Sequence, residues 1–402
     1  MRRNFLPILG LLSLFVLGSC SAERDPKIAS LKHAIGVADS QLLDAAAELD
    51  TTNCFPRSLM PRFRAVDAKD WTSGFFPGSL WQCYRFTGDE KLLAEAEKYT
   101  GRLEGIQYYK GTHDLGFMVF CSFGQQMQTL HDRHSEAVIV EAAKSLVSRC
   151  DPRIGLIRSW DFGEWNYPVI IDNMMNLELL MWAADRSGDK SLRVYRDVAG
   201  RHADITMKNH FRDDASSFHV VSYNDDGTVE SRGTFQGYSD SSAWARGQAW
   251  GLYGYTMCYR ETGDAKYLKH AERIADFIMH HPNTPADRIP YWDYNAPDIP
   301  DAPRDASAAA IMASAFVDLS SLTNKPEEKG RYLKMAEKQL RTLASDAYLA
   351  RPGENGNFLL MHSVGSRPDN HEIDVPLTYA DYYFLEALLK YSRTTQTKPN
   401  NN

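Results

Sequence analysis

Amphipathic segments with apolar residues at helical spacing recur along most of this chain, separated by short polar turns. Alanine-rich segments such as 92–99 and 267–278 follow turns in which a glycine ends one helix and an aspartate caps the next. The clearest of these turns are Gly88-Asp89, Gly188-Asp189 and Gly263-Asp264, with weaker copies at 131–135 and 323–326. Helix pairs that recur at intervals of roughly 45 to 75 residues indicate a helical repeat architecture.

The spacing of these helix pairs also predicts how the chain closes. Residues 25–393 have room for about six pairs. Six pairs close naturally into an all-α (α/α)6 toroid, also called a six-hairpin barrel. We therefore expect residues 25–393 to form a single domain of this kind. An open helical solenoid is the structural alternative.

Strand patterns are few and short. Residues 217–223 are rich in β-branched and aromatic side chains, and the turn sequence 224–227 follows them. Together they predict a small β-hairpin on the rim of the toroid. Residues 282–303 contain six of the 18 prolines and should form a long rim loop. Residues 394–402 are polar and are expected to be a frayed tail.

Residues 1–20 have the layout of a bacterial lipoprotein signal peptide. Arg2 and Arg3 give a positive start, and residues 6–17 form an apolar run that is too short to be a good membrane span. The sequence Leu-Gly-Ser-Cys at 17–20 resembles a lipobox. We expect lipidation of Cys20 and a mature periplasmic protein anchored at the outer membrane. A plain signal peptide with an incidental cysteine is the alternative. The sequence predicts no oligomeric state.

Composition narrows the classes of function. The chain is 43% hydrophobic and 24% charged, its net charge is −7, and it has no long basic run, which disfavours nucleic-acid binding. Of its six cysteines, those other than Cys20 show no CxxC spacing, so we expect neither a disulfide framework nor a zinc site. We expect no metal and no other cofactor. Aromatic residues make up 11% of the chain, which fits a sugar-binding cleft or simply a large core.

The segment 168–177 places an acidic residue among apolar ones. On a helix, the Asp172 side chain shares a face with Met175 and Leu179. Desolvation of a carboxyl group raises its pKa, and a carboxyl that is protonated near neutral pH can act as a general acid. From this segment alone, a buried aspartate that caps a neighbouring helix is an equally good interpretation.

Asp114 also stands at the head of an apolar run. Two buried carboxylates that face one cavity push their pKa values apart, which leaves one acid and one ionised partner. Glycoside-cleaving sites commonly use such a pair. The alternative is that Asp114 is the N-cap of a helix beginning at Leu115, which is the commoner fate of such an aspartate.

The segment 244–254 combines Arg246, Trp250 and three glycines on a predicted helix. Glycine inside a helix costs about 1 kcal/mol relative to alanine, so these glycines favour tight packing or close approach of a ligand. An arginine beside a tryptophan can bind a carboxylate while the indole stacks on a sugar. A close-packed interior helix with a surface arginine is the simpler interpretation. The aromatic, glycine-rich segment 71–78 predicts a sugar platform or a well-packed turn.

Taken in order, these segments resemble glycoside hydrolase family 88, the unsaturated glucuronyl hydrolases. The matching segments are 71–78, 113–117, 171–177, 244–250, 290–293, 305–309 and 381–383. Each motif is weak, but their order over nearly the whole mature chain is specific. The resemblance implies an (α/α)6 catalytic domain. It also implies a hydrolase that removes 4,5-unsaturated uronic acid from the non-reducing end of lyase-generated glycosaminoglycan oligosaccharides.

The resemblance also implies roles for individual residues. Asp172 would be the general acid and base, and Asp114 its carboxylate partner. Further residues would contact the sugar, and these are Trp71, His113, Trp160, His219, Gln236, Arg246 and Trp250. His210 is a competitor for the place of His219.

Residues 361–367 are expected to form a rim loop, and the resemblance implies that this loop borders the sugar next to the unsaturated uronate. There, Ser363, Ser366 and Arg367 would bind a sulfate group, since a guanidinium can make two parallel bonds to an oxyanion. The alternative for Arg367 is a solvent-exposed ion pair with Asp369 or Glu372, which is worth little.

Two rival functions stay open on the sequence alone. Unsaturated rhamnogalacturonyl hydrolases share the fold and chemistry but act on pectin fragments, and the matches at Asp114 and 244–250 favour family 88. A non-catalytic sugar-binding lipoprotein would use the aromatic residues and would need no pair of buried carboxylates.

Overall fold

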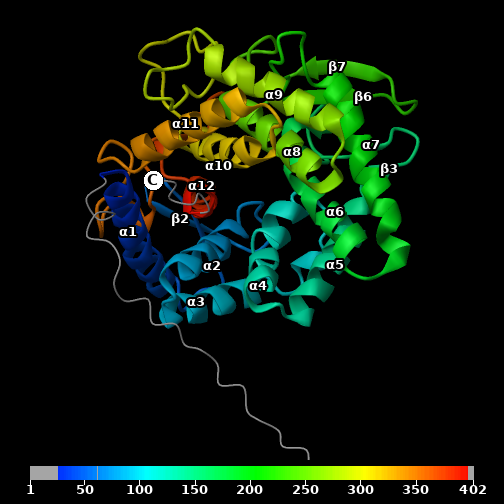
Figure 1. Ribbon diagram of the computed structural model, residues 1–402. Coiled ribbons are helices and arrows are strands. Elements are labelled where there is room, and N and C mark those ends of the chain that lie inside the picture. Colours follow the sequence, from blue (N-terminus) through cyan, green and yellow to red (C-terminus); the bar gives the residue numbers. More distant parts are fainter. Residues whose placement is uncertain (1–25, 61, 397–402) are drawn as a thin grey trace, which may run out of the picture.

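The computed structural model describes residues 26–60 and 62–396, and helices dominate this part of the chain (Figure 1). One set of helices forms an inner ring, and its members are α2 (Phe75–Thr87), α4 (Phe123–Leu130), α6 (Leu177–Arg186), α8 (Ala245–Thr262), α10 (Ala306–Leu322) and α12 (Thr378–Gln396). A second set lies outside the first, and its members are α1 (Pro26–Glu48), α3 (Glu90–Gly101), α5 (Arg133–Val147), α7 (Val194–Asn209), α9 (Ala265–His280) and α11 (Pro326–Leu343). Helix α12 packs against both α10 and α2, so the ring closes on itself. The predicted (α/α)6 toroid is confirmed, and the open solenoid is wrong.

The turns between paired helices have the chemistry that the sequence predicts. Gly88 and Gly263 end α2 and α8 in the left-handed conformation, with φ of 70° and 71°. The side chains of Asp89 and Asp264 then accept hydrogen bonds from the first turns of α3 and α9. Glycine adopts positive φ without a Cβ clash, and an aspartate N-cap satisfies an otherwise unpaired backbone N–H. Each sharp reversal is therefore encoded locally.

Glycines allow the inner helices to pack closely. A Cβ atom at Gly254 of α8 would lie 2.5 Å from the Met174 side chain. At the start of α2, a Cβ atom at Gly74 would lie 2.2 Å from the Phe117 carbonyl oxygen, and one at Gly78 would lie 2.3 Å from that of Cys121. Only glycine permits these approaches. The segments 71–78 and 244–254 are thus closely packed helix starts.

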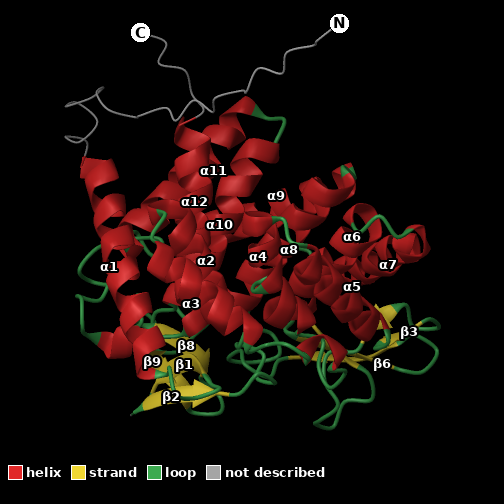
Figure 2. Cartoon of the chain, turned by 90° about the horizontal axis from the view of Figure 1, so that it is seen from below, coloured by secondary structure: helices red, strands yellow, loops and turns green. Residues whose placement is uncertain are grey.

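Short antiparallel sheets gather at one end of the ring (Figure 2). Their strands are β1 (Phe55–Leu59) with β2 (Phe63–Val66), β3 (Cys150–Asp151) with β4 (Leu156–Ile157), β5 (Pro168–Ile170) with β6 (Val220–Tyr223) and β7 (Val229–Gly233), and β8 (Ser363–Ser366) with β9 (His371–Val375). The expected hairpin is β6–β7, with β5 added at its edge. The expected rim loop at 361–367 is wrong, because Ser363–Ser366 pair with β9 as a strand.

Short helical turns complete the described part of the chain. Turns of the 3-10 type are η2 (Ile106–Tyr108), η4 (Ile171–Asn176), η5 (Lys190–Arg193) and η6 (Asn355–Asn357), and η3 (Gly116–Phe120) is a π-helical turn. Residues 282–303 lie in the expected long loop between α9 and α10. Helix α12 continues to Gln396, past residue 394 where the sequence predicted the tail to begin.

Two predictions fall on residues outside the described part. The signal peptide with Cys20 lies in residues 1–25, and most of the predicted tail lies in residues 397–402. Within the described residues, no helix combines the length and apolar character that a membrane crossing needs.

Candidate active site

Asp172 lies where β5 passes into α6, at the end of the ring that carries the sheets. It sits in the tight turn η4 rather than in an α-helix, which corrects the sequence expectation. The backbone N–H of Ile171 donates to the carbonyl oxygen of His219 at 3.0 Å, which continues the β5–β6 pairing by one step. This pairing brings His219 Nε2 to 3.6 Å from Asp172 Oδ2. The small sheet therefore positions a histidine against the acid.

His219 is held in one tautomer. Its Nδ1 accepts hydrogen bonds from the backbone N–H groups of Phe235 and Gln236, both at 3.1 Å. Burial lowers the pKa of His219 well below its usual value, so the ring is neutral. A neutral ring that accepts at Nδ1 carries its proton on Nε2, the atom that faces Asp172. His210, the competitor, instead donates through Nε2 to the Val169 carbonyl oxygen at 3.0 Å.

The Asp172 carboxyl is desolvated. Its side chain is 11% exposed, and Oδ2 has no hydrogen-bond partner among the described residues. Burial raises the pKa of Asp172 to about 7, the charge of Asp114 adds to this rise, and the Arg246 guanidinium opposes it. The Trp250 indole N–H also lowers the pKa of Asp172, although it has no hydrogen-bond partner among the described residues. The neighbouring helical turns η4 and α6 are capped at Ile170 and Asn176, and no backbone N–H of another described helix donates to the Asp172 carboxyl, so the helix-cap interpretation of Asp172 is wrong.

Asp114 is not a helix cap either. The Thr112 hydroxyl donates to Asp114 Oδ2 at 2.5 Å, and His113 Nε2 lies 3.2 Å from Oδ1. The helical turn that follows is η3, which is capped at Leu115 without a side-chain bond. A π-helical turn is rare and frequently marks a functional site.

One amide joins the segments of the two acids. The Phe117 N–H in η3 donates to Asn176 Oδ1 in η4 at 3.0 Å. Gly116 allows this contact, since a Cβ there would lie 2.6 Å from the Cα of Asn176. The turn that follows Asp114 and the turn that contains Asp172 are thereby fastened to each other.

Arg246 is a buried cation, not the surface arginine of the simpler interpretation. Its side chain is 1% exposed, and its guanidinium lies 3.4 Å from the Asp305 carboxylate. Nη1 donates to the Val364 carbonyl oxygen, and Nη2 donates to that of Gly365 at 2.6 Å. The guanidinium therefore holds β8 against α8 and acts on Asp172 through its charge. Its Nε atom has no partner among the described residues.

Gln236 supports the same strand. Its Nε2 donates to the Gly365 carbonyl oxygen at 3.1 Å, beside the bond from Arg246. Two predicted sugar-contact residues thus fasten β8 from two different elements.

The predicted aromatic residues occupy two different settings. Trp71 and Trp250 pack inside the ring, where both contact Phe117 at ring-centroid distances of 5.5 and 5.2 Å. Trp160 lies at the rim, 6.2 Å from the His219 ring and stacked on Phe162 at 4.8 Å. Phe162 is 55% exposed, so this group offers aromatic surface next to the acid.

Sequence reasoning missed three members of the rim group. Phe162, Trp165 and Phe235 all contact Trp160, at ring-centroid distances of 4.8, 5.5 and 5.6 Å. The cluster of aromatic residues in 160–165 could have revealed Phe162 and Trp165. Phe235 follows β7, far along the chain, and no sequence pattern links it to that cluster.

The predicted sulfate-binding residues do not form an open polar loop. Ser363 is fully buried, and the Ser366 hydroxyl donates to Asp369 Oδ2 at 2.6 Å. Arg367 is 41% exposed, and its Nη2 lies 3.9 Å from the Asp298 carboxylate. The alternative interpretation of Arg367, a solvent-exposed ion pair, is thus correct in kind, but the partner is Asp298 rather than Asp369 or Glu372. Of the three residues, Arg367 alone presents its polar group to solvent.

Within the described residues, no group of His, Cys, Asp or Glu side chains could hold a metal ion. The cysteines there are free thiols, namely Cys54, Cys83, Cys121, Cys150 and Cys258.

The closed ring of helix pairs, with two acids at the end that carries the sheets, fits the class of glycoside hydrolases, which commonly use a pair of carboxyl groups. No family model matches the chain. The chain is 49% identical over 343 residues to the unsaturated glucuronyl hydrolase of Formosa agariphila, covering 84% of each chain. It is 34% identical over 346 residues to that of Bacillus sp. GL1, covering 81% of this chain and 87% of the relative.

A solved structure agrees with these relatives. The crystal structure of an unsaturated glucuronyl hydrolase specific for heparin matches with a TM-score of 0.88 and 50% identity, over 92% of this chain and 98% of that one. The chain therefore belongs to the unsaturated glucuronyl hydrolases, glycoside hydrolase family 88.

The raised pKa of Asp172 predicts a pH-dependent cost to folding. The native state holds this proton up to about pH 7, whereas the unfolded state releases it near 3.8. Stability is therefore lost as the pH rises between these values, and Asp172→Asn escapes that loss. We expect the advantage of Asp172→Asn in free energy of unfolding to grow by about 2 to 3 kcal/mol between pH 5 and pH 8, measured by urea denaturation. Asp225→Asn, in an exposed turn, is the matched control and should show no such growth. An Asp172→Asn advantage that is equal at both pH values would mean that the carboxyl is not desolvated.

Proposed function

We propose that this protein removes 4,5-unsaturated uronic acid from the non-reducing end of lyase-generated glycosaminoglycan oligosaccharides. The observation that carries the proposal is the buried Asp172, whose pKa is raised to about 7 beside Asp114 and His219. The chain's 49% sequence identity to an unsaturated glucuronyl hydrolase supports the same function.

The proposed reaction begins at the C4=C5 double bond, which is a vinyl ether. Asp172 gives its proton to C4, and an oxocarbenium-like centre forms at C5. The Asp172 carboxylate then takes a proton from water, whose oxygen attacks C5. The resulting hemiketal opens and expels the neighbouring sugar. Only one water molecule is consumed, because Asp172 recovers from that water the proton it gave to C4 and ends the cycle protonated.

The environment of Asp172 suits both halves of this cycle. A pKa of about 7 leaves the carboxyl protonated in much of the protein near neutral pH, as a general acid requires. The negative charge of Asp114 favours that protonated form. After proton transfer, Nε2–H of His219 faces the new carboxylate and can donate to it. The carboxylate remains desolvated, which makes it a strong base toward water.

The rival functions have less support. Five curated relatives are named unsaturated glucuronyl or unsaturated chondroitin disaccharide hydrolases. A sugar-binding lipoprotein without catalysis gains nothing from a buried carboxyl that lacks a hydrogen-bond partner, because such burial costs folding free energy.

Asp172→Asn should keep the fold and lose turnover. The amide has the shape of the carboxyl but cannot transfer the proton, and general acid–base catalysis is typically worth about 10² to 10⁴-fold. We expect kcat to fall by at least about 10²-fold. Turnover is measured as the loss of the enol-ether ultraviolet absorbance of a lyase-generated disaccharide. Asp225→Asn should retain wild-type activity. Near-normal turnover in folded Asp172→Asn would remove Asp172 from the mechanism.

We propose further that Arg367 favours sulfated substrates. One solved relative is a Streptococcus agalactiae mutant complexed with dGlcA-GalNAc6S, which is 28% identical with a TM-score of 0.75. Arg367 borders a shallow cavity with Tyr238 and Trp292. Its pairing with Asp298 is long and exposed, so a sulfate group can compete for the guanidinium.

Sulfated disaccharides should therefore be accepted at least as well as unsulfated ones. Arg367→Ala should lower the ratio of sulfated to unsulfated kcat/KM by roughly threefold to tenfold, the loss of one charge-assisted contact. Arg341→Ala removes an arginine of similar exposure on α11 and should leave the ratio unchanged. An unchanged ratio in Arg367→Ala would show that this turn does not recognise sulfate.

We also propose that Cys20 carries a lipid anchor at the outer membrane. Support comes from the sequence of residues 1–20, which precede α1 closely. Helix α1 ends beside the strands at the end of the candidate site, so its first residue, Pro26, lies at the opposite end (Figure 2). An anchor only six residues before Pro26 would leave the candidate site facing away from the membrane.

Metabolic labelling with a fatty acid should tag the wild-type protein and Cys54→Ala, but not Cys20→Ala. We expect Cys20→Ala to move from the membrane to the soluble fraction, because the acyl chains provide the membrane affinity. Wild-type protein that is unlabelled and soluble would contradict the anchor.

A further inference from the structure

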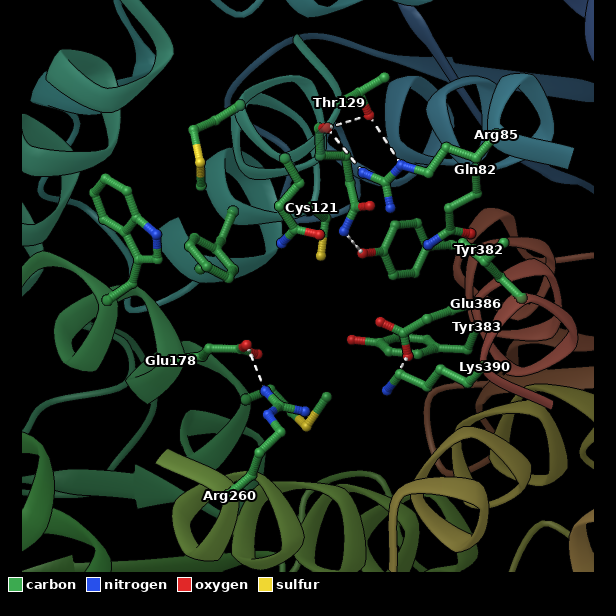
Figure 3. A pocket seen from close by; sticks show the side chains of 18 of the residues that line it. Gln82, Arg85, Cys121, Thr129, Glu178, Arg260, Tyr382, Tyr383, Glu386 and Lys390 are labelled. Atoms are coloured by element: carbon green, nitrogen blue, oxygen red, sulfur yellow. Dashed lines mark hydrogen bonds and ion pairs between the residues drawn. The ribbon is translucent and has the colours of Figure 1, made fainter. Parts of the chain in front are cut away.

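A second cavity of about 750 Å³ opens at the far end of the ring (Figure 3). The inner helices α2, α4, α6, α8 and α12 all contribute to its lining. Arg85, Thr129 and Arg260 lie near the C-terminal ends of α2, α4 and α8, whereas Glu178 lies at the start of α6. Gly116 and Met175 also line it, and they belong to the turns that follow Asp114 and contain Asp172. The cavity thus lies behind the two acids and apart from them.

Arg85 gives the cavity a cation without a carboxylate partner. Its Nε donates to the Thr129 hydroxyl and its Nη2 to the Gln125 carbonyl oxygen, both at 2.9 Å. It forms no ion pair with any carboxylate of the described residues, and burial lowers the pKa of its guanidinium. A desolvated cation of this kind attracts an anion.

Neighbouring amides lack partners as well. Gln82 is 1% exposed, and neither its Nε2 nor its Oε1 has a hydrogen-bond partner in the described structure. Gln125 donates through Nε2 to the Tyr382 hydroxyl at 3.0 Å, but its Oε1 is unpartnered. A buried polar group without a partner destabilises the folded state. Both amides line the cavity, where hydroxyl groups of a ligand would satisfy them.

The charges on the facing wall neutralise one another. Arg260 pairs with Glu178 at 2.5 Å, and Lys390 pairs with Glu386 at 3.1 Å (Figure 3). Trp182 and Phe120 add apolar surface to the lining. The cavity therefore combines one unpaired guanidinium, free amide groups and aromatic carbon.

We propose that this cavity binds a sugar acid, a hydroxylated pyranose that carries a carboxylate. The carboxylate pairs with Arg85, ring hydroxyls bond to Gln82 and Gln125, and ring carbons contact the aromatic side chains. The volume falls within the range of about 300 to 1,000 Å³ that is usual for small-molecule sites. The proposed second site does not depend on the proposed reaction, because only residues that line the cavity would bind the sugar acid.

Calorimetric titration with D-glucuronate tests the site without turnover. We expect saturable binding to wild type that weakens at least tenfold in Arg85→Gln and in Gln82→Leu. Trp160→Ala, which removes aromatic surface beside His219 at the candidate active site, should bind as wild type does, which separates the two sites. Arg341→Gln on α11 is the matched control and should also bind normally. Thermal denaturation checks that each variant is folded.

Two further ligands test which chemical class of ligand the cavity binds. D-glucose lacks the carboxylate and acetate lacks the hydroxyls, so each should bind at least tenfold more weakly than D-glucuronate. Acetate binding as tight as that of D-glucuronate would reduce the cavity to a simple anion site and overturn the proposal. Binding that is absent, or equal in wild type, Arg85→Gln and Gln82→Leu, would also overturn it.

Discussion

The carboxyl of Asp172 is buried against His219 and has no hydrogen-bond partner for Oδ2, and the rest of the site is arranged around that burial. Desolvation alone favours the neutral acid, which is what proton donation to a carbon atom needs. The two backbone bonds to His219 Nδ1 fix which ring nitrogen meets the acid. Because the histidine stays neutral, it adds a hydrogen-bond donor without adding a charge that would lower the pKa of Asp172.

Arg246 limits how far burial raises the pKa of Asp172. It is a buried cation that lowers the pKa of Asp172, yet its guanidinium is bonded to two carbonyl oxygens of β8 and lies near Asp305. Asp305 also caps α10 through Ser307 and Ala308. The Arg246 guanidinium thus joins α8, α10 and β8, and it also lowers the pKa of Asp172. Stability of the rim and the proton affinity of Asp172 are therefore coupled.

The sequence predicted those features that are encoded locally. Gly-Asp turns gave the helix pairs, and carboxylates at the heads of apolar runs, together with the family resemblance, pointed to Asp172 and Asp114. Features formed by distant segments were missed or misjudged. Arg246 bonds Val364 across 118 residues, so neither its burial nor the strand β8 was visible from nearby residues. The turns η3 and η4 depart from α-helical geometry, and the contact between them through Asn176 joins segments 59 residues apart. The rim group around Trp160 likewise needs Phe235 from a separate loop.

The central claim is that cleavage proceeds by hydration of the C4=C5 bond with a proton from Asp172, and the direct test is to run the reaction in D₂O. Mass spectrometry and proton NMR of the released uronate at early times would locate any new deuterium. We expect one deuterium at C4 and loss of the double bond. A released uronate that keeps its C4=C5 bond and carries no deuterium would instead show ordinary cleavage at the anomeric carbon, without hydration of the double bond.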